Sequence, residues 1–215
     1  NGKTLARLWQ LEATDILLHA LPLYHVHGLF VAMHCALMSG ARIFFMEKFN
    51  AQDVIEHLPH CSVMMGVPTY YSRMLANPTF DEQSCYKMRL FVCGSAPLSA
   101  QLWQAFAART GHKILERYGM SEAGIITSNP YNGERIEGTV GFALKDVRLR
   151  VANKHGNECS TEEVGELQVK GPNVFAGYWK KEKDNPTYFT KDFFFKTGDL
   201  ATQSADGRIA IVGRI

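Results

Sequence analysis

The chain has 215 residues, of which 46% are hydrophobic and 20% charged, a composition that supports a packed core of one large or two small domains. Its 23 basic and 21 acidic residues give a formal net charge of +2, which predicts no nucleic-acid or membrane-surface partner. No apolar run approaches the roughly 20 residues of a membrane-spanning helix, and the first ten residues lack the apolar segment of a signal peptide.

The first half of the chain alternates short apolar runs with helical patterns. Helix signals include an Asn50 cap, a Thr69 cap, a Ser99 cap, and glycine ends at Gly40 and near Gly111. The runs at 16–21, 42–46, 63–67, 90–93 and 114–118 are predicted strands, and 29–39, 51–60, 70–76 and 100–109 are predicted helices. This order predicts an α/β fold with a mostly parallel sheet, covered by helices and binding ligands beyond the carboxyl ends of its strands.

The second half changes to short alternating strands, predicted at 147–151, 166–170 and 208–212. The pairs Asn132-Gly133, His155-Gly156 and Asp206-Gly207 separate them, and the last is typical of a tight hairpin turn. We therefore predict an α/β nucleotide- and acyl-binding subdomain over 1–124 and a smaller β-rich, barrel-like subdomain over 125–215 that pack together and share one ligand.

Three polar turns suit a nucleotide, and the first two follow predicted strands. In LERYGMSEAG, at 115–124, Glu122 is a hard oxygen ligand for Mg²⁺ and Ser121 a hydrogen-bond donor for phosphate. In the second turn, Gly94 with its small neighbours lets the main chain lie against a flat base, for which Tyr118 offers an aromatic face. In FKTGDLA, Asp199 can accept hydrogen bonds from both ribose hydroxyls.

Plainer interpretations of these residues stay open. Ser121 and Glu122 also favour the start of a helix. Gly94 and Tyr118 fit a simple strand-to-helix turn and a core tyrosine, and Asp199 fits a solvated surface position. The turns are more informative together than singly.

These turns, with LPLYHVHG at 21–28 and GELQVKGPNVFAGYW at 165–179, resemble the adenylate-forming superfamily of acyl-CoA synthetases, luciferases and peptide-synthetase adenylation domains. Within it the chain is most similar to the malonyl-CoA synthetases, through LPLYHVHGLFVA, MGVPTYYSRML, RLFVCGSAPL, LERYGMSE and KGPNVFAGYW in that order. The resemblance implies an AMP-forming ligase of fatty acid metabolism that uses ATP, Mg²⁺ and coenzyme A to form malonyl-CoA through an acyl adenylate. The alternatives are another short-chain or aryl acid ligase, and a non-catalytic nucleotide-binding module.

The resemblance also implies roles for particular residues in nucleotide binding. Ser121 would contact phosphate, Glu122 would help to bind Mg²⁺, and Asp199 with Arg214 would contact the ribose. The backbone segments expected to frame the adenine are Gly94, Ser95 and Ala96 together with Glu116, Arg117, Tyr118 and Gly119. A terminal surface arginine is the plainer interpretation of Arg214.

The acyl pocket is implied by a different set of residues. His25 would border it and gate carboxylate entry, with His27 beside it; a zinc site at this His-x-His pair lacks a third ligand nearby in the sequence. Arg73 and Ser95 would hold the second carboxylate of malonate, since a guanidinium facing a pocket is costly unless paired. The plainer interpretation is that Arg73 reaches solvent or pairs with an acid such as Glu82.

The chain is expected to be part of a longer protein. In the resembled family a glycine-rich phosphate loop would precede Asn1, and a catalytic lysine in a C-terminal domain would follow Ile215, so the 215 residues alone are expected to be inactive. Five cysteines without a Cys-x-x-Cys pair indicate a reducing compartment, and Cys93 is expected to be a core residue. We predict a cytoplasmic location, with an organellar matrix as the alternative if a targeting peptide is missing; the oligomeric state is not predicted.

Overall fold

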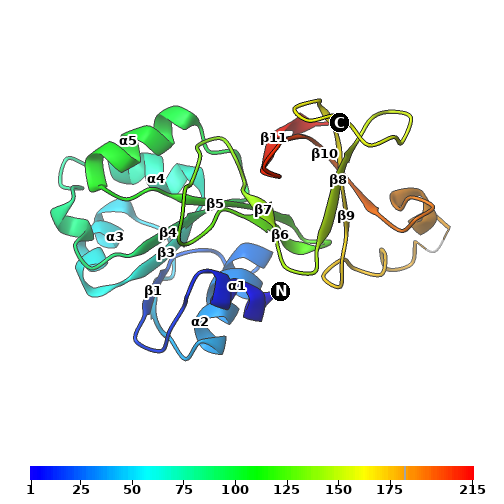
Figure 1. Ribbon diagram of the computed structural model, residues 1–215. Coiled ribbons are helices and arrows are strands. Elements are labelled where there is room, and N and C mark those ends of the chain that lie inside the picture. Colours follow the sequence, from blue (N-terminus) through cyan, green and yellow to red (C-terminus); the bar gives the residue numbers. More distant parts are fainter. Residues whose placement is uncertain (182) are drawn as a thin grey trace.

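A computed structural model of the chain, which describes residues 1–181 and 183–215, places a large α/β part beside a smaller β part (Figure 1). The α- and π-type helices are α1 (Gly2–Leu8), η1 (His27–Met33), α2 (His34–Met38), α3 (Ala51–His57), α4 (Pro68–Leu75) and α5 (Ala100–Thr110). Short 3-10 turns are η2 (Leu58–His60), η3 (Gln83–Cys85) and η4 (Asn185–Tyr188). None of the helices described is both long and apolar enough to cross a membrane.

The larger sheet has seven strands in the order β2-β1-β3-β4-β5-β6-β7. Its strands are β1 (Ile16–His19), β2 (Arg42–Phe45), β3 (Val63–Gly66), β4 (Leu90–Cys93), β5 (Leu115–Met120), β6 (Gly124–Ser128) and β7 (Phe142–Ala143). The five predicted strands are all present and pair in parallel from β2 to β5, which confirms the predicted mostly parallel sheet. Strands β6 and β7 then extend the same sheet by antiparallel pairing.

The smaller sheet is antiparallel, in the order β11-β10-β9-β8. Its strands are β8 (Arg148–Ala152), β9 (Gly165–Lys170), β10 (Phe195–Gln203) and β11 (Ile209–Arg214). The Asp206-Gly207 pair lies in the β10–β11 hairpin, where Gly207 has φ +91°. The change between sheets falls between Ala143 and Arg148, later in the chain than the subdomain boundary at 124/125, which stays a prediction.

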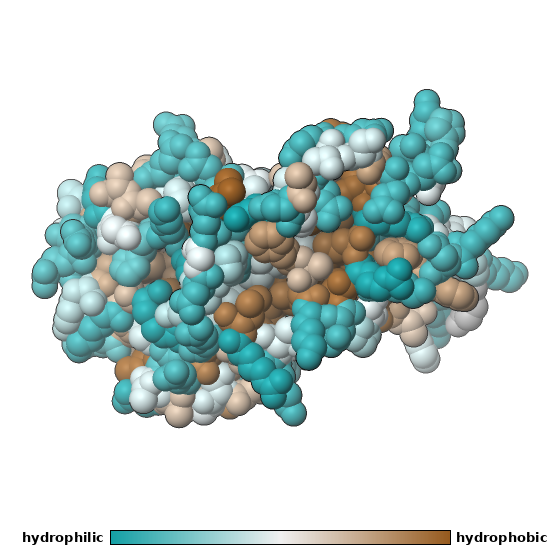
Figure 2. Space-filling view, in the orientation of Figure 1, coloured by the Kyte–Doolittle hydropathy of each residue, from teal (hydrophilic) through white to brown (hydrophobic). Residues whose placement is uncertain are grey.

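Both faces of the inner parallel strands β1, β3 and β4 are buried, so their side chains divide between two cores. Leu17, Val63 and Met65 pack with α1, η1 and α2, whereas Leu18 and Met64 pack with α3, α4 and α5. This alternation explains why the strands are continuously apolar in the sequence. Figure 1 shows α3, α4 and α5 on one side of the sheet and α1 and α2 on the other. On the face seen in Figure 2, apolar side chains gather between the two parts of the molecule, within a largely hydrophilic surface.

Helix ends follow the sequence signals with one exception. Asn50 Oδ1 accepts hydrogen bonds from the first turn of α3, Ser99 Oγ accepts from Leu102 N at 3.2 Å, and Gly111 ends α5 at φ +74°. The predicted Thr69 cap is wrong, because α4 already begins at Pro68. Proline suits a first helical position, since its fixed φ is helical and its missing N–H would have no partner there.

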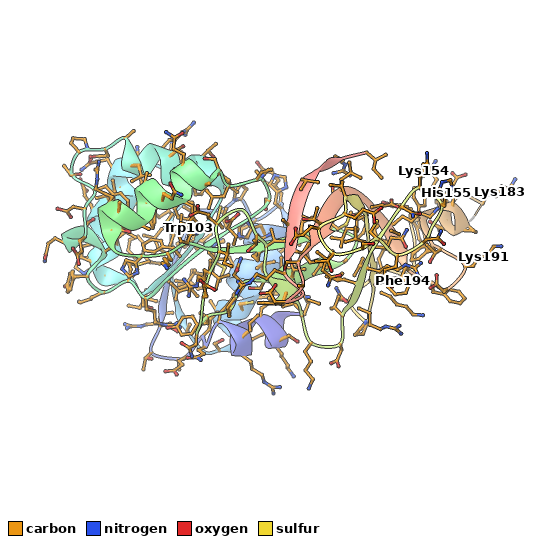
Figure 3. All side chains as sticks on the ribbon, turned by 45° about the horizontal axis from the view of Figure 1, so that its top comes forward. Trp103, Lys154, His155, Lys183, Lys191 and Phe194 are labelled. Carbon is orange, nitrogen blue, oxygen red and sulfur yellow. The ribbon has the colours of Figure 1, made fainter. Side chains whose placement is uncertain are left out.

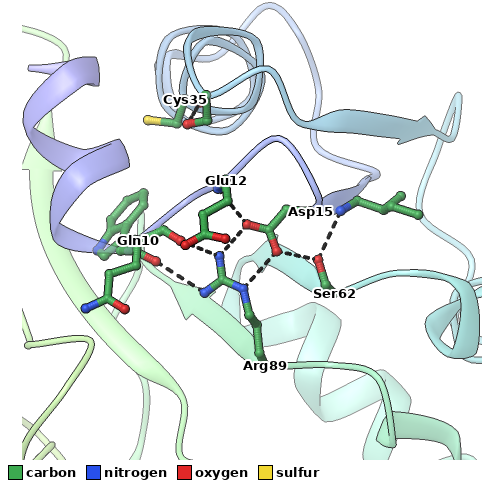
Figure 4. Close-up of polar contacts among 9 residues, drawn as sticks. Gln10, Glu12, Asp15, Cys35, Ser62 and Arg89 are labelled. Atoms are coloured by element: carbon green, nitrogen blue, oxygen red, sulfur yellow. Dashed lines mark hydrogen bonds and ion pairs between the residues drawn. The ribbon is translucent and has the colours of Figure 1, made fainter.

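A polar cluster joins the amino ends of β1, β3 and β4 (Figure 4). Arg89 Nε donates to Asp15 Oδ1 at 2.8 Å, and its Nη2 donates to Asp15 Oδ2 and to the Gln10 carbonyl oxygen. Ser62 Oγ donates to Asp15 Oδ1 at 2.7 Å and accepts from Ile16 N at 3.0 Å. The cluster therefore connects the end of α1 to three strands. It lies at the amino ends of the strands, whereas the ligand is predicted to bind beyond their carboxyl ends.

Candidate functional site

A cavity of about 660 Å³ lies beyond the carboxyl ends of the parallel strands, where the β5–β6 turn and the end of β11 meet them. It is lined by Leu21, Pro22, His25, Val26, His27, Gly28, Val31, Val67, Tyr70, Ser95, Arg117, Gly119, Met120, Ser121, Glu122, Gly124, Ile125 and Arg214. Segments distant in the sequence thus share one cleft, at the sheet edge where α/β folds bind ligands.

The cavity wall includes eight of the predicted site residues: His25, His27, Ser95, Arg117, Gly119, Ser121, Glu122 and Arg214. Gly94, Ala96, Glu116, Tyr118 and Asp199 are not in the wall; Gly94 and Ala96 adjoin Ser95, and Glu116 and Tyr118 adjoin Arg117. Arg73 also lies outside it.

The Ser121–Glu122 turn is part of a strand hairpin and does not begin a helix. Met120 ends β5, Gly124 begins β6, and the two residues pair across the turn. Glu122 Oε1 accepts a hydrogen bond from Tyr178 Oη at 2.9 Å, and the Glu122 carbonyl oxygen accepts from Phe175 N at 2.8 Å. The turn therefore presents the Glu122 carboxylate on the cavity wall in an arrangement supported by the loop that follows β9.

Asp199 is nearly buried and lies between Tyr118 and Arg214. The Tyr118 hydroxyl donates to Asp199 Oδ2, and Arg214 Nη1 lies 3.8 Å from Asp199 Oδ1. Burial and this hydrogen bond raise the pKa of the Tyr118 phenol well above its usual range, so the phenol remains a donor. Asp199 is therefore linked to the cavity wall through Arg214, and the Tyr118 hydroxyl holds Asp199. The predicted role of the Tyr118 ring as a face for adenine stays a prediction.

Ser95 and His27 meet on the cavity wall. Ser95 Oγ lies 3.2 Å from His27 Nδ1, and Ser95 has φ +69°, a backbone conformation uncommon for residues other than glycine. Burial, with the nearby charge of Arg117, lowers the pKa of His27 well below its usual value, so the imidazole is neutral at pH 7. His27 Nε2 has no hydrogen-bond partner among the residues described.

Arg117 brings a guanidinium to the cavity wall. Its side chain is 4% exposed, and Nε and Nη2 have no hydrogen-bond partner in the described part of the chain. Burial lowers its pKa to about 10, which still leaves it charged at pH 7. Gly94 makes room for it, since a Cβ on Gly94 would lie 2.4 Å from Arg117 Cζ. The sequence prediction gave Arg117 only a backbone role, although a charged residue within the predicted buried strand 114–118 is itself a signal.

Of two further predicted site residues, Glu116 is buried and Arg73 is exposed. Burial raises the pKa of Glu116 to about 7, and its Oε1 has no partner among the described residues. Arg73 is exposed on α4 and does not line the cavity, although its charge acts on the phenol of Tyr70, which does. The predicted contact between Arg73 and a bound acid therefore stays a prediction.

Several basic residues of the smaller part lie far from the cavity. Figure 3 shows Lys154, His155, Lys183 and Lys191 at the end of the smaller part remote from Trp103, projecting outward. For Lys170, Lys180, Lys181 and Lys183 the sequence leaves open contact with coenzyme A phosphates, with a solvated surface as the plainer interpretation; none of the four lines the cavity.

Comparison with known proteins identifies the family. A family model described as AMP-binding enzyme matches residues 2–179. The chain belongs to the AMP-binding enzyme family. The predicted adenylate-forming family is thus confirmed, and with it the mixed, mostly parallel sheet beside a smaller antiparallel one.

Relatives of the chain include proteins named as CoA ligases. A probable CoA ligase of Humulus lupulus is 38% identical, over 99% of this chain and 38% of its own length. A mitochondrial malonate–CoA ligase of Mus musculus is 37% identical, over 98% of this chain and 42% of its own length. The chain therefore spans about two fifths of the length of these relatives.

Solved structures of CoA ligases are also similar to the chain. The ATP-bound MatB of Rhodopseudomonas palustris has a TM-score of 0.98 and 43% identity, covering 100% of this chain and 43% of its own. A malonyl-CoA ligase in a product complex with methylmalonyl-CoA and AMP has a TM-score of 0.90 and 37% identity, covering 100% of this chain and 47% of its own. The chain therefore has, over all of its residues that the structure describes, the fold of the corresponding part of these ligases.

Proposed function

We propose that the protein carrying this chain is an ATP-dependent acid–thiol ligase that joins malonate to coenzyme A through an acyl-adenylate intermediate. The observation that carries this proposal is the shared cavity, whose lining includes a buried guanidinium and the Ser121–Glu122 turn. The guanidinium suits a small acid with a second negative charge, and the Ser121–Glu122 turn suits a nucleoside triphosphate. The named malonate–CoA ligases among the relatives support the same assignment.

The substrate class follows from the surroundings of Arg117. A buried guanidinium whose Nε and Nη2 lack partners within the described residues is costly, and a carboxylate is its best partner. A fatty acyl chain would leave the charge unpaired, whereas the second carboxylate of malonate would neutralise it. Ser95 Oγ and the neutral imidazole of His27 lie beside the same wall and can complete the hydrogen bonds of that carboxylate.

A second group of residues at the cavity suits the nucleotide. Ser121 can donate to phosphate, and Asp199 with Arg214 would meet the ribose, as the resemblance implies; of these two, Arg214 lines the cavity. Glu122 fits a Mg²⁺ ion, because this cation is bound by one or two carboxylates together with substrate phosphates. When bound, Mg²⁺ shields the charge of the phosphates. No cluster of three His, Cys, Asp or Glu side chains in the described part of the chain would hold a metal without such a substrate.

The chemistry asked of these residues is mainly positioning. A malonate oxygen attacks the α-phosphorus of ATP, forming a P–O bond as the bond to pyrophosphate breaks. The thiol of coenzyme A then attacks the acyl carbon of the adenylate, and AMP leaves with the shared oxygen. Arg117 and His27 would hold the acid for the first step, and Ser121 and Glu122 would hold the phosphates in line with it.

ATP–pyrophosphate exchange in the full-length protein tests this function. With malonate and butyrate compared at equal concentration, we expect exchange at least tenfold faster with malonate, because only malonate carries a second carboxylate for Arg117. Equal rates with the two acids would remove the dicarboxylate assignment and leave another acid ligase. Absence of exchange with any of a panel of short-chain and aryl acids would favour a non-catalytic nucleotide-binding module.

A further inference from the structure

The loop that follows β9 holds the Ser121–Glu122 turn at three points. Tyr178 Oη donates to Glu122 Oε1 at 2.9 Å. Phe175 N donates to the Glu122 carbonyl oxygen at 2.8 Å, and Asn173 Nδ2 donates to the Ala123 carbonyl oxygen at 2.7 Å. Two of these contacts fix the main chain of the turn, and the contact from Tyr178 acts on the carboxylate itself.

Tyr178 is held in place independently of Glu122. Its ring lies edge-on to Phe175, with centroids 4.8 Å apart, and edge-on to Tyr188 at 4.9 Å. Its backbone N donates to Asn185 Oδ1 at 2.8 Å, and Asn185 Nδ2 donates back to the Tyr178 carbonyl oxygen at 3.1 Å. The hydroxyl is therefore a fixed donor whose position does not depend on the group that it contacts.

The hydroxyl engages one oxygen of the carboxylate, and among the described residues no donor engages the other, Oε2. A carboxylate on a turn can rotate about its side-chain torsions, and a bond to one oxygen selects the rotamer that presents the second. The backbone contacts from Phe175 and Asn173 cannot do this, because they act on carbonyl groups. The Tyr178 contact thus has a use beyond holding the loop to the turn.

We propose that Tyr178 is a positioning residue that orients the Glu122 carboxylate toward the divalent cation bound with the triphosphate. This inference rests on the proposed function, which assigns the cation to Glu122. Partners that orient a metal-binding carboxylate change metal affinity by about 10- to 100-fold when they are removed. Since the turn keeps its two backbone contacts without the hydroxyl, the effect is expected on the cation and not on the nucleotide alone.

Binding measurements on the full-length protein test the inference without turnover. Mn²⁺ replaces Mg²⁺ as a paramagnetic probe, and its affinity for the protein–ATP complex is measured by electron paramagnetic resonance. ATP affinity is measured separately by calorimetry in EDTA. Tyr178→Phe keeps the ring between Phe175 and Tyr188, Tyr188→Phe is the matched control, and Glu122→Gln is the reference for loss of the carboxylate charge.

We expect Tyr178→Phe to weaken Mn²⁺ binding about tenfold, with unchanged ATP affinity in EDTA and an unchanged midpoint of thermal unfolding. Tyr188→Phe is expected to match the wild type in all three measurements. Wild-type Mn²⁺ affinity in Tyr178→Phe, with weakened binding in Glu122→Gln, would overturn the positioning role alone. Wild-type affinity in Glu122→Gln would overturn the assignment of the cation to Glu122. Equal losses of Mn²⁺ affinity and metal-free ATP affinity in Tyr178→Phe would mean a purely structural contact and overturn the inference.

Discussion

The two opposite edges of the seven-stranded sheet each hold an arginine, and their surroundings differ. At the amino edge, Arg89 meets the Asp15 carboxylate and two backbone carbonyls. Beside the carboxyl end of β4, Arg117 is more deeply buried, and its Nε and Nη2 meet no partner within the described residues. One arginine is neutralised by the protein, and the other faces a cavity.

The difference separates a residue that stabilises the fold from one that serves a ligand. When a buried ion pair has its full set of hydrogen bonds, the attraction offsets much of the desolvation cost, and removing one partner destabilises the folded protein. A buried charge without a partner costs free energy of folding, so its presence at a cavity indicates a charged ligand. Substitutions at the amino edge should therefore lower stability and spare activity, whereas substitution of Arg117 should lower activity and spare stability.

The largest effect is expected from Arg117→Met, which keeps the side chain's length and removes its charge. Losing one side of a buried, hydrogen-bonded charge pair costs about 3 kcal/mol or more, so the kcat/KM for malonate should fall at least about 100-fold in the full-length protein. The midpoint of thermal unfolding should stay the same or rise, because an unpaired buried charge is gone. Initial-rate kinetics and thermal unfolding of the same preparation measure both.

Butyrate provides the control for Arg117→Met. Without a second carboxylate, butyrate gains nothing from the guanidinium, so its kcat/KM should change by less than about threefold, which is under 1 kcal/mol. Parallel losses for both acids would show that Arg117 supports the site in general. A large fall in unfolding midpoint would place Arg117 with Arg89 as a residue of the fold.

Asp15→Asn is expected to have the opposite profile. The substitution removes the negative partner of Arg89, whose side chain is 26% exposed, so solvent relieves part of the cost. We expect the free energy of unfolding to fall by about 2 kcal/mol at pH 7, with kcat/KM per folded molecule unchanged. Urea unfolding and kinetics check this, and a loss of activity without a loss of stability would contradict the separation of the two edges.

The same cluster predicts a pH dependence of stability. Burial opposes the charged form of Asp15, but hydrogen bonds from Arg89, Glu12 and Ser62 hold its pKa below the ordinary value of 3.8. A lowered pKa in the folded state gives stability that is fully present above the ordinary value and is lost as pH falls through the folded-state pKa. The difference in unfolding free energy between wild type and Asp15→Asn should therefore shrink below about pH 4, and a constant difference would exclude this pairing.

Much of the scaffold could be predicted from the sequence because its signals are local. Apolar runs bounded by turns located the five parallel strands, and Asn50 and Ser99 marked helix starts that their side chains cap. Strands β6, β7 and β10 were not predicted: GIITS beside a polar turn gives no indication of which sheet β6 joins. The predicted polar turn in FKTGDLA is wrong, because these residues lie within β10. Pairing partners depend on contacts between distant segments, which periodicity does not contain.

The candidate site could be predicted as a set of turns but not as a set of side-chain directions. The sequence placed Ser95, Ser121 and Glu122 at strand ends, and the structure brings them to one cavity. It could not show that Arg117 faces the cavity while Arg73 lies exposed outside the wall, because both occur next to apolar residues. The contact between Tyr178 and Glu122 joins residues 56 positions apart and leaves no local pattern.

The smallest effect is expected from removing a single hydrogen bond at the amino edge. Ser62→Ala removes one hydrogen bond to Asp15 and one acceptor for Ile16 N, but Arg89 still neutralises the carboxylate. We expect a loss of about 1 kcal/mol in unfolding free energy and no change in kcat/KM. Ser72→Ala, which removes an exposed hydroxyl that donates to the Thr69 carbonyl oxygen, is the matched control and should change stability by less than about 0.5 kcal/mol. If Ser62→Ala costs as much as Asp15→Asn, the hydroxyl and not the charge pair holds this edge together, and Arg89 is no longer the counterpart of Arg117.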